Sequence, residues 1–275
     1  IYFLVFSIYP VIKGLYMSTQ KPLLLGGGVF VGLENYRNVL QDSMFWQALG
    51  NTLVLSGGMI ALGVSVPLFV AIALHELPFA PLRKLTQTVI YTPHLFSWVV
   101  VGGIWIQVLS PDGGLFNELA KLVGLGSVHF LADTTWIKPV LVLLSTWKGM
   151  GYNAVIYYAA ISSLDPQIYE AATVDGASRW QKISKLTLPL LMPTVSVVFV
   201  LSAVGALRIF DQVFILRNAA TSRTIDVVMT YVYDRGMREF RLGESTAASF
   251  MVTVVGLMTL GFLRRAMNVD ETEAS

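Results

Sequence analysis

The sequence predicts an all-α integral membrane protein, and three observations carry this prediction. Of the 275 residues, 55% are hydrophobic and 13% are charged, with a mean hydropathy of +0.64, whereas about one quarter of the residues in a soluble domain are charged. Six apolar stretches approach the roughly 20 residues that a helix needs to cross a bilayer. Their apolar runs do not alternate with polar residues as the strands of a membrane barrel do. We therefore expect six membrane-spanning helices.

The six expected spans are separated by connections of very different lengths. They cover residues 1–18, 49–74, 89–109, 137–161, 190–210 and 247–263. Glycine and proline interrupt several of them, and neighbouring helices in a membrane tolerate these residues and often use them for close packing. The chain begins inside an apolar run at Ile1 rather than at Met, so we expect it to be a trimmed segment with an incomplete first span.

Basic residues near the span ends predict the orientation of the chain. Basic residues beside span ends are enriched on the cytoplasmic side of a membrane. Two basic pairs lie at such positions, Arg83-Lys84 and Arg264-Arg265. Both termini and the connection 162–189 would then be cytoplasmic, and the connections 19–48 and 211–246 would be external. The polar and aromatic composition of these external connections predicts ordered caps that could receive a soluble partner.

The composition also excludes several classes of function. Without cysteine the chain forms no disulfide and no thiolate metal site, and a net charge of +2 scattered between apolar runs argues against a nucleic-acid partner. The histidines lie in different regions without carboxylates at metal-ligand spacing, so no metal site is expected at His75, His94 and His129. No phosphate-binding glycine loop and no nucleophile motif is present. We expect a non-catalytic chain that binds no cofactor.

The connection between the fourth and fifth spans predicts two short helices. Asp165 is a favourable N-cap, with Pro166 in the first turn, and Gly176 can adopt the positive φ that ends the helix. Ser178 can cap the second helix. Small residues on the first helix would let another backbone approach closely, while Trp180 and Ile183 are expected to anchor the segment to the bundle. The pattern is typical of a docking helix, and also of a surface hairpin that only joins two spans.

The same connection resembles a known protein family. Its sequence, Glu170-Ala171-Ala172, three residues, Gly176, nine residues and Leu186-Thr187-Leu188-Pro189, is similar to the EAA loop of permease subunits of bacterial binding-protein-dependent ABC importers. Leu186 is a departure, since the family usually has isoleucine there. Motifs along nearly the whole chain are similar to the carbohydrate-uptake branch, the relatives of the maltose permease: Gly32-Leu33-Glu34-Asn35-Tyr36, Asn51-Thr52, Asp112-Gly113-Gly114-Leu115 and Tyr231-Val232-Tyr233. The segments 93–100 and 147–151 look most like permeases for complex oligosaccharides, including acidic ones derived from alginate and pectin.

This resemblance implies a fold, partners and a location. Residues 1–275 would form one MetI-like, maltose-permease-like transmembrane domain, with residues 162–189 as a cytoplasmic EAA coupling loop. The first helix of the loop would dock into an ATPase subunit, which binds ATP and magnesium, through Glu170, Ala171, Ala172, Asp175 and Gly176. The implied partners are a second homologous permease, two ATPase subunits, an extracytoplasmic sugar-binding protein and membrane lipid. The implied location is the bacterial inner membrane, as a multi-pass protein.

Charged residues inside the spans indicate where a solute could bind, because each costs about 2.5–3.5 kcal/mol at the bilayer centre. Lys148 lies near the middle of the fourth span, where the spans offer no carboxylate to pair with it. Arg208 has Asp211 three residues later, a spacing that favours an internal ion pair at a helix end. Lys13 lies late in the first span and can extend to the interface. Lys148 is therefore the strongest candidate for a solute contact.

Resemblance to the maltose permease extends this prediction to a set of residues. Its sugar-contacting positions align with Ser145, Lys148, Gly149 and Tyr152 in the fourth span, and with Ser202, Ala206 and Ile209 in the fifth. The first four share one helix face. Apolar residues replace two polar contacts of the second set, and Lys148 with Arg208 would suit an oligosaccharide that carries carboxylates. The predicted substrate site is therefore Ser145, Lys148, Gly149, Tyr152, Ser202 and Arg208.

A secondary transporter driven by an ion gradient is the main alternative. Such proteins are expected to carry intramembrane acids or an inverted repeat, whereas each Asp and Glu of this chain lies in a connection or at a span end. A scaffold protein without transport would leave Lys148 unexplained. We therefore predict the permease subunit of an ATP-driven importer of oligosaccharide.

Overall fold

The computed structural model describes the backbone of residues 1–23, 27–124, 126–206 and 208–266. Helices dominate these residues, as the sequence predicts, and a two-stranded hairpin is the one sheet in the described part. The side chains of Arg264 and Arg265, one of the two basic pairs that predicted the orientation, lie outside the described part.

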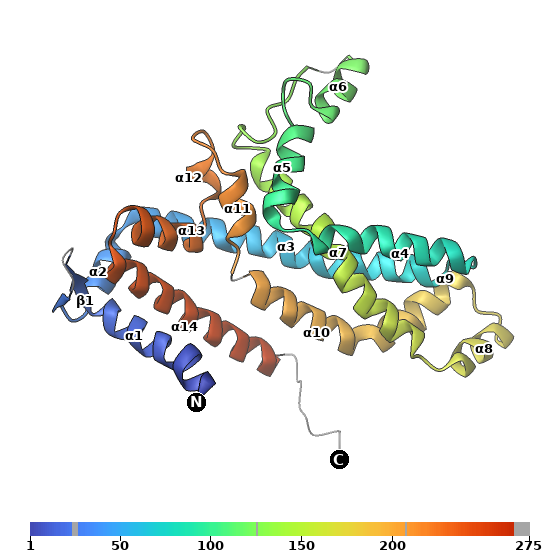
Figure 1. Cartoon of the computed structure of the whole chain (residues 1–275). Helices are drawn as coiled ribbons and strands as arrows, with labels where there is room; N and C mark the ends of the chain where they lie inside the picture. Colours follow the sequence, from blue (N-terminus) through green and yellow to red (C-terminus); the bar gives the residue numbers. More distant parts are fainter. Residues whose placement is uncertain (24–26, 125, 207, 267–275) are drawn as a thin grey trace.

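A central layer of helices is built around one long helix, α3 (Ser43–His75). It packs along α7 (Ile137–Ser162) and α10 (Leu188–Ala206), and α4 (Ala80–Leu95) packs along the other side of α7 (Figure 1). A Cβ added to Gly151 would lie 2.2 Å from the carbonyl oxygen of Ile90, so α4 and α7 touch through their backbones. The prediction that glycines serve helix packing is confirmed here. At Gly57, Gly63, Gly103 and Gly149, an added Cβ would meet no atom of the described chain within 4 Å, so packing within this chain does not require glycine there.

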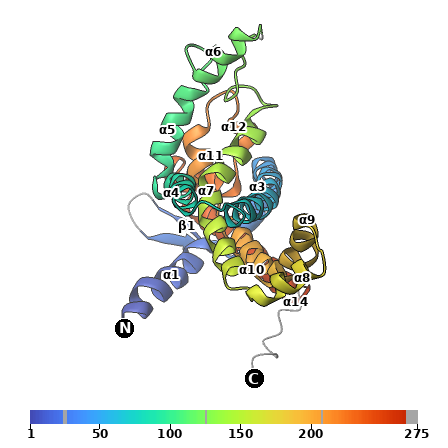
Figure 2. The same cartoon turned by 90° about the vertical axis from the view of Figure 1, so that its right-hand side faces the viewer.

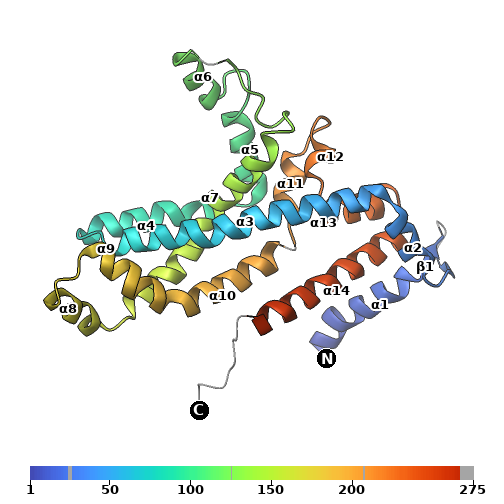
Figure 3. The same cartoon turned by 180° about the vertical axis from the view of Figure 1, so that it is seen from behind.

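A second group of helices lies beside this layer. The π-helical turn η1 (Leu4–Ile8) continues into α1 (Tyr9–Ser18), which packs against α14 (Leu242–Ala266). Figure 3 shows α1 and α14 running side by side, with α10 between α14 and the far end of α3. The α14 helix also contacts α10, so the two groups are continuous.

The two long connections predicted to be external form an ordered cap at one end of α3. The first contains β1 (Gln20–Pro22), β2 (Gly28–Phe30) and α2 (Glu34–Gln41), with the strands antiparallel and Lys21 opposite Val29. The second contains α11 (Asp211–Leu216), α12 (Ser222–Ile225), α13 (Val228–Tyr233) and the π-helical turn η3 (Asp234–Arg238). We call residues 19–42 and 211–241 the external cap. The prediction of ordered caps is confirmed.

The third predicted span is not one helix. Residues 89–109 divide between the end of α4 and α5 (Trp98–Val108), which are bent by 103° relative to each other. Ser97 has extended backbone angles, and its hydroxyl accepts a hydrogen bond from the Val100 N–H, so it caps a new helix. Pro93 lies in the last turn of α4 and lacks the N–H that would continue the hydrogen-bond ladder. Beyond α5, the short helix α6 (Leu115–Leu122) projects from the bundle.

The other predicted spans agree with the structure to different degrees. Three helical segments are long and apolar enough to cross a membrane, namely Ser43–His75, Arg179–Ala206 and Leu242–Thr259. The bent pair α4–α5 would be a fourth. The α7 helix has the length, but polar residues such as Lys148 lie at its centre. For α1 and α7, membrane crossing stays a prediction. The fifth span is expected to continue to residue 210, but α10 ends earlier, at Ala206.

Apolar contacts divide into three clusters that follow α3 from end to end. Phe45 and Ala48 pack with α13 and α14 in the external cap, and Leu55 packs in the middle with α7, α11 and α12. Ala71 packs at the other end with Tyr157 of α7 and with α10. The α3 helix therefore ties the external cap to the opposite end of the molecule.

Candidate functional site

The break between α4 and α5 brings a backbone carbonyl to Lys148. The Nζ of Lys148 donates a hydrogen bond to the carbonyl oxygen of His94 at 3.1 Å, in the last turn of α4. It also lies 5.5 Å from the ring centroid of Trp98, the first residue of α5. The ammonium therefore stabilises a helix end whose carbonyls the break has freed. Within the part of the chain that the structure describes, no carboxylate pairs with Lys148.

Aromatic side chains surround this ammonium. The His94 ring stacks on Tyr152, with centroids 4.9 Å apart and planes 17° apart. Trp147 meets Trp105 of α5 edge to face, with centroids 5.4 Å apart. Tyr152 is 43% exposed, so one aromatic face beside Lys148 is accessible. Rings with an accessible face next to a charged donor are suited to a solute that has both apolar and charged groups.

One buried polar atom of α5 and one of α7 have no hydrogen-bond partner in the described structure. The Oγ of Ser145 and the Nε1 of Trp105 are buried without a hydrogen bond. Burying a polar atom without a partner costs about 1–3 kcal/mol, so each atom is a candidate for a ligand contact. Gly149, half-buried in the next turn, leaves open space where a side chain would lie.

Each predicted substrate residue has a definite place in the structure. Ser145, Lys148, Gly149 and Tyr152 all lie on α7, as predicted. Ser202 is half-buried in α10, a helix that packs against α7. Arg208 is exposed and lies after the end of α10. No hydrogen bond or ion pair links the two sets in the described residues, so a single substrate site composed of both stays a prediction.

The ion pair favoured for Arg208 is absent. The prediction assumed that Arg208 and Asp211 share one helix, but α10 ends at Ala206 and Asp211 begins α11. Residues three apart face each other only in a continuous helix. No ion pair joins these two side chains in the described structure, and the interpretation of Arg208 as half of an end-of-helix pair is wrong.

The connection 162–189 folds into the two predicted helices at the end of α3 opposite the cap (Figure 2). In α8 (Pro166–Val174), the Asp165 carboxylate accepts a hydrogen bond from the Gln167 N–H at 2.9 Å, and Gly176 has a φ of +77°. In α9 (Arg179–Lys182), Ser178 forms a capping box with Gln181. The chain then continues through the π-helical turn η2 (Ile183–Thr187) into α10. Each cap read from the sequence is confirmed. We call residues 165–187 the hairpin.

Contacts within the hairpin hold it closed, and two of its large apolar side chains, Val174 and Trp180, are mostly exposed. The Tyr169 hydroxyl and the Thr187 Oγ1 are 2.9 Å apart, and the Lys182 Nζ donates to the Thr173 Oγ1 at 2.7 Å. Val174 is 88% exposed. The expectation that Trp180 anchors the hairpin to the bundle is wrong, since this side chain is 71% exposed.

The five residues predicted to couple to an ATPase lie on α8 and the turn after it. Ala172 is half-buried and the other four are exposed, namely Glu170, Ala171, Asp175 and Gly176. The small residues leave the helix backbone accessible to another protein. Their role in coupling stays a prediction.

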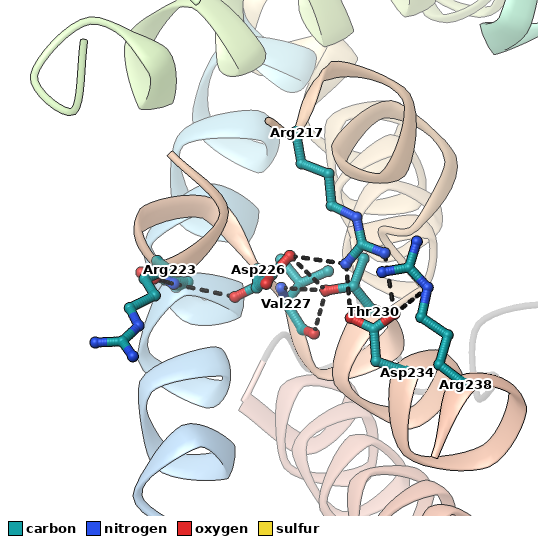
Figure 4. Close-up of polar contacts among 8 residues, drawn as sticks. Arg217, Arg223, Asp226, Val227, Thr230, Asp234 and Arg238 are labelled. Atoms are coloured by element: carbon teal, nitrogen blue, oxygen red, sulfur yellow. Dashed lines mark hydrogen bonds and ion pairs between the residues drawn. The ribbon is translucent and has the colours of Figure 1, made fainter. Parts of the chain in front are cut away.

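The external cap is organised around Arg217, whose side chain is 9% exposed (Figure 4). Its guanidinium donates to both oxygens of Asp234 at 2.8 and 3.0 Å, and to Asp226 at 3.2 Å. It also lies 4.8 Å from the ring centroid of Phe214. Arg238 adds a second ion pair to Asp234 at 3.3 Å. This cluster joins the end of α11, the loop between α12 and α13, and η3.

A second set of charges attaches the cap to the start of α3. The Asp42 carboxylate caps α3 by accepting from the Met44 N–H at 2.9 Å, accepts from the Tyr231 hydroxyl at 2.9 Å, and pairs with Arg235. Burial raises the pKa of Asp42, but these hydrogen bonds outweigh burial and hold the pKa below its usual range. Burial, together with the hydrogen bond to Asp42, raises the pKa of Tyr231 to about 12. Asn51 of α3 donates to the carbonyl oxygens of Arg223 and Asp226, which fixes the loop before α13.

Some contacts of the candidate site, and of the external cap, could not be predicted from the sequence. The His94 carbonyl is free to accept from Lys148 because α4 ends there. Since each residue has a backbone carbonyl, the sequence does not indicate which one Lys148 contacts. Trp98 and Trp105 join the site because α5 turns through 103°. The arginines of the last external connection are visible in the sequence, and most of their acidic partners lie nearby in the chain, but the pairing of Arg235 with Asp42 joins two distant connections.

Comparisons with known proteins agree with this geometry. The family "Binding-protein-dependent transport system inner membrane component" matches residues 55–268. The chain is 35% identical over 269 residues to the polygalacturonan/rhamnogalacturonan transport system permease protein YteP of Bacillus subtilis (strain 168), covering 96% of this chain and 84% of the relative.

Two solved structures are similar over nearly the whole chain. One is the crystal structure of a bacterial ABC transporter involved in the import of the acidic polysaccharide alginate, with a TM-score of 0.90, 34% identity, and coverage of 98% of this chain and 92% of the other. The second is a bacterial alginate ABC transporter in complex with an alginate pentasaccharide-bound periplasmic protein. Its TM-score is 0.90, its identity is 33%, and it covers 97% of this chain and 90% of the other.

Proposed function

Because the chain belongs to the family of binding-protein-dependent transport system inner membrane components, the multi-pass permease subunits of ABC importers, we propose that it conducts an acidic oligosaccharide across the bacterial inner membrane. An extracytoplasmic binding protein would deliver the oligosaccharide to the external cap. Transport would use the interface of this chain with a second, homologous permease. Two ATPase subunits would bind ATP and magnesium and supply the energy.

The observation that carries the proposal is the unneutralised ammonium of Lys148. It has a backbone carbonyl and a tryptophan ring as neighbours, and no carboxylate among the described residues. A lysine held near the middle of a membrane-spanning helix is costly unless it serves a function. Only one of its three N–H donors has a partner in the described structure, so two are free to bind a carboxylate.

Aromatic rings complete a site for sugar rings that carry carboxylates. Tyr152 and Trp147 expose part of their surface beside Lys148, and Ser145 has an unpartnered hydroxyl on the same helix. Aromatic faces pack against the apolar faces of sugar rings, while the charged donor orients a carboxylate. The relatives point the same way, since alginate is named as an acidic polysaccharide and polygalacturonan is a polymer of uronic acid.

The hairpin supplies the contact with the ATPase in this proposal. Glu170, Ala171, Ala172, Asp175 and Gly176 would form the surface that enters a cleft of an ATPase subunit. The exposed side chains of Val174 and Trp180 would become buried there, which would explain why apolar groups face outward at this end. The α3 helix and α10, which begin or end beside the hairpin, would carry the motion toward the break at α4–α5.

Uptake into proteoliposomes tests the substrate. The importer is reconstituted with its binding protein, and uptake of a uronate oligosaccharide is compared with uptake of the same oligosaccharide after reduction of its carboxyls. In Lys148→Met, we expect the half-saturating concentration for the uronate to rise about tenfold or more, because a hydrogen bond to a charged group contributes about 1.5–3 kcal/mol. Uptake of the reduced sugar should change little.

The matched control is Lys138→Met, which removes a lysine from the first turn of the same helix. It should transport both sugars as the wild type does. If Lys148→Met leaves uronate uptake unchanged, Lys148 only caps the end of α4. The proposal that this site binds an acidic oligosaccharide would then be wrong.

A further inference from the structure

A cavity of about 250 Å³ lies between the hairpin and the ends of the long helices. Its apolar lining comes from three helices, through Ile72, Ile161 and Ile183. Its polar lining is Arg179, Lys182, His75, Glu76, Tyr169 and Thr187. The volume is many times the roughly 10–15 Å³ that one water needs, so a phosphate group with its substituents fits. Apolar and basic side chains therefore share the lining.

The two cations of this cavity have no anionic partner in the described structure. Arg179 forms no ion pair there, and the Lys182 ammonium donates to the neutral hydroxyl of Thr173. Glu76 is the one carboxylate in the lining, and it is not paired with either cation. The cavity therefore keeps a surplus of positive charge.

A third cation, Arg83, lies beside the same tyrosine as a residue of the cavity lining. The Arg83 guanidinium is 6.0 Å from the ring centroid of Tyr158, and the ring of His75, which lines the cavity, is 6.3 Å from the same ring. Arg83 comes from α4, whereas Arg179 and Lys182 come from α9, so the positive charge is contributed by two separate elements.

The cavity lies where the apolar helices end. His75 is the last residue of α3, and Ile161 is in the last turn of α7. Helix ends of this kind lie at the level of lipid headgroups. A pocket with apolar and basic residues at this level matches the chemistry of a phospholipid, since cations bind the phosphate and apolar side chains pack against the glycerol and first methylenes.

We infer that this cavity is a binding site for the headgroup of an anionic phospholipid, with Arg179 and Lys182 as the phosphate contacts. The inference is independent of which solute the permease carries. A lipid bound here would contact the end of α3, the end of α7 and the hairpin together. It would therefore hold the hairpin in one position relative to the helices that the hairpin moves.

The test uses the complete importer complex in mild detergent, with bound lipids counted by native mass spectrometry during titration with short-chain phosphatidylglycerol. Wild type should bind a phosphatidylglycerol that the double variant Arg179→Gln/Lys182→Gln binds about 30-fold more weakly, because each cation near an anionic headgroup contributes about fivefold. Phosphatidylcholine, which has no net charge, should bind the wild type no better than the variant.

The matched control is Lys84→Gln/Lys185→Gln, which removes two exposed cations from the same end of the molecule without touching the cavity lining. It should keep phosphatidylglycerol affinity within about threefold of wild type. An equal loss in both double variants would overturn the site, because the attraction would then be a diffuse effect of surface charge.

Two further outcomes would also overturn the inference. Inorganic phosphate that binds the wild type as tightly as phosphatidylglycerol does would show a phosphate site rather than a lipid site. Loss of the ATPase from Arg179→Gln/Lys182→Gln, with the control still holding it, would assign these cations to the ATPase contact.

Discussion

The external cap and the hairpin lie at opposite ends of α3 and treat their charges in opposite ways. In the cap, four arginines pair with acids of the same chain: Arg217, Arg235, Arg238 and Arg241. At the hairpin end, no ion pair is found in the described structure for five basic residues: Arg83, Lys84, Arg179, Lys182 and Lys185. Four arginines of the cap are neutralised within the chain, although Lys21, Arg37 and Arg223 of the cap also form no ion pair in the described structure.

Burial does not follow the same division, because the cap also exposes large apolar side chains, namely Leu23, Val29, Phe30, Leu33, Leu40, Met237 and Phe240. Val228 and Tyr231 of the cap are among its buried residues, while Val174 and Trp180 of the hairpin are mostly exposed. The ion pairs join the cap elements to one another and to the start of α3. Exposed apolar side chains are candidates for contact with other molecules at both ends. The difference between the two ends therefore lies in how their charges are neutralised.

The largest effect is expected when the cap loses its central cation. Replacing Arg217 with methionine leaves Asp226 and Asp234 partly buried without their guanidinium, and breaking a buried ion pair from one side costs about 3–5 kcal/mol. Thermal unfolding of the purified importer should show a large drop in the midpoint. Arg223→Met, an exposed arginine of the same connection, should leave the midpoint close to wild type. Equal midpoints for the two variants would contradict the central role of Arg217.

The second effect belongs to the hairpin and should leave stability unchanged. Glu170→Arg reverses a charge at the predicted ATPase contact, and like charges across an interface cost several kcal/mol. Co-purification should recover the second permease but less than about one tenth of the ATPase. Glu118→Arg on the projecting helix α6 is the matched charge reversal and should retain the ATPase. Full recovery of the ATPase with Glu170→Arg would remove the hairpin from the coupling interface.

A matched pair of tyrosine variants compares the two ends directly. Tyr231→Phe removes a hydrogen bond to the charged Asp42, which contributes about 1.5–3 kcal/mol, whereas Tyr169→Phe removes a bond to the neutral Thr187, which contributes about 0.5–1.5 kcal/mol. The midpoint of thermal unfolding should therefore fall further in Tyr231→Phe than in Tyr169→Phe. The reverse order would show that the hairpin is held as tightly as the cap.

The smallest effect is a dependence of stability on pH that comes from Asp42 of the cap. The pKa of Asp42 is held below its usual range by its hydrogen bonds, so its contribution to stability is complete above the unfolded pKa of about 3.9. That contribution is lost as the pH falls through the lower, folded pKa. Between pH 7 and pH 5, the difference in unfolding midpoint between wild type and Asp42→Asn should be constant, and it should shrink below about pH 4. A difference that already shrinks at pH 6 would contradict this assignment.

Local rules were sufficient for the hairpin and for the fold class. Asp165, Gly176 and Ser178 form the caps that their residue types predict, because a cap depends on a few neighbouring residues and not on the rest of the fold. Composition alone identified a helical membrane protein, since a bilayer requires long apolar helices. The resemblance of the EAA loop identified the family from the same short segment.

Packing between distant elements decided the remainder. The break at Ser97 looked like the middle of one span, because the apolar run continues through it, and hydropathy carries no information on direction. The exposure of Trp180 was missed because an apolar side chain can face either the bundle or a partner. Lys148 was recognised as costly, but its carbonyl partner on His94 exists only because α4 ends there.

The sequence by itself therefore determined the class of protein, the family and the caps of the hairpin. It also identified Lys148 as a charge that is costly inside a membrane span. The tertiary structure decided which arginines are neutralised, which aromatic rings surround Lys148, and where a basic cavity opens between α3, α7 and the hairpin. The physical reason is range. Helix caps and hydropathy act over a few residues, whereas ion pairs and cavities depend on side chains that only the packed helices bring together.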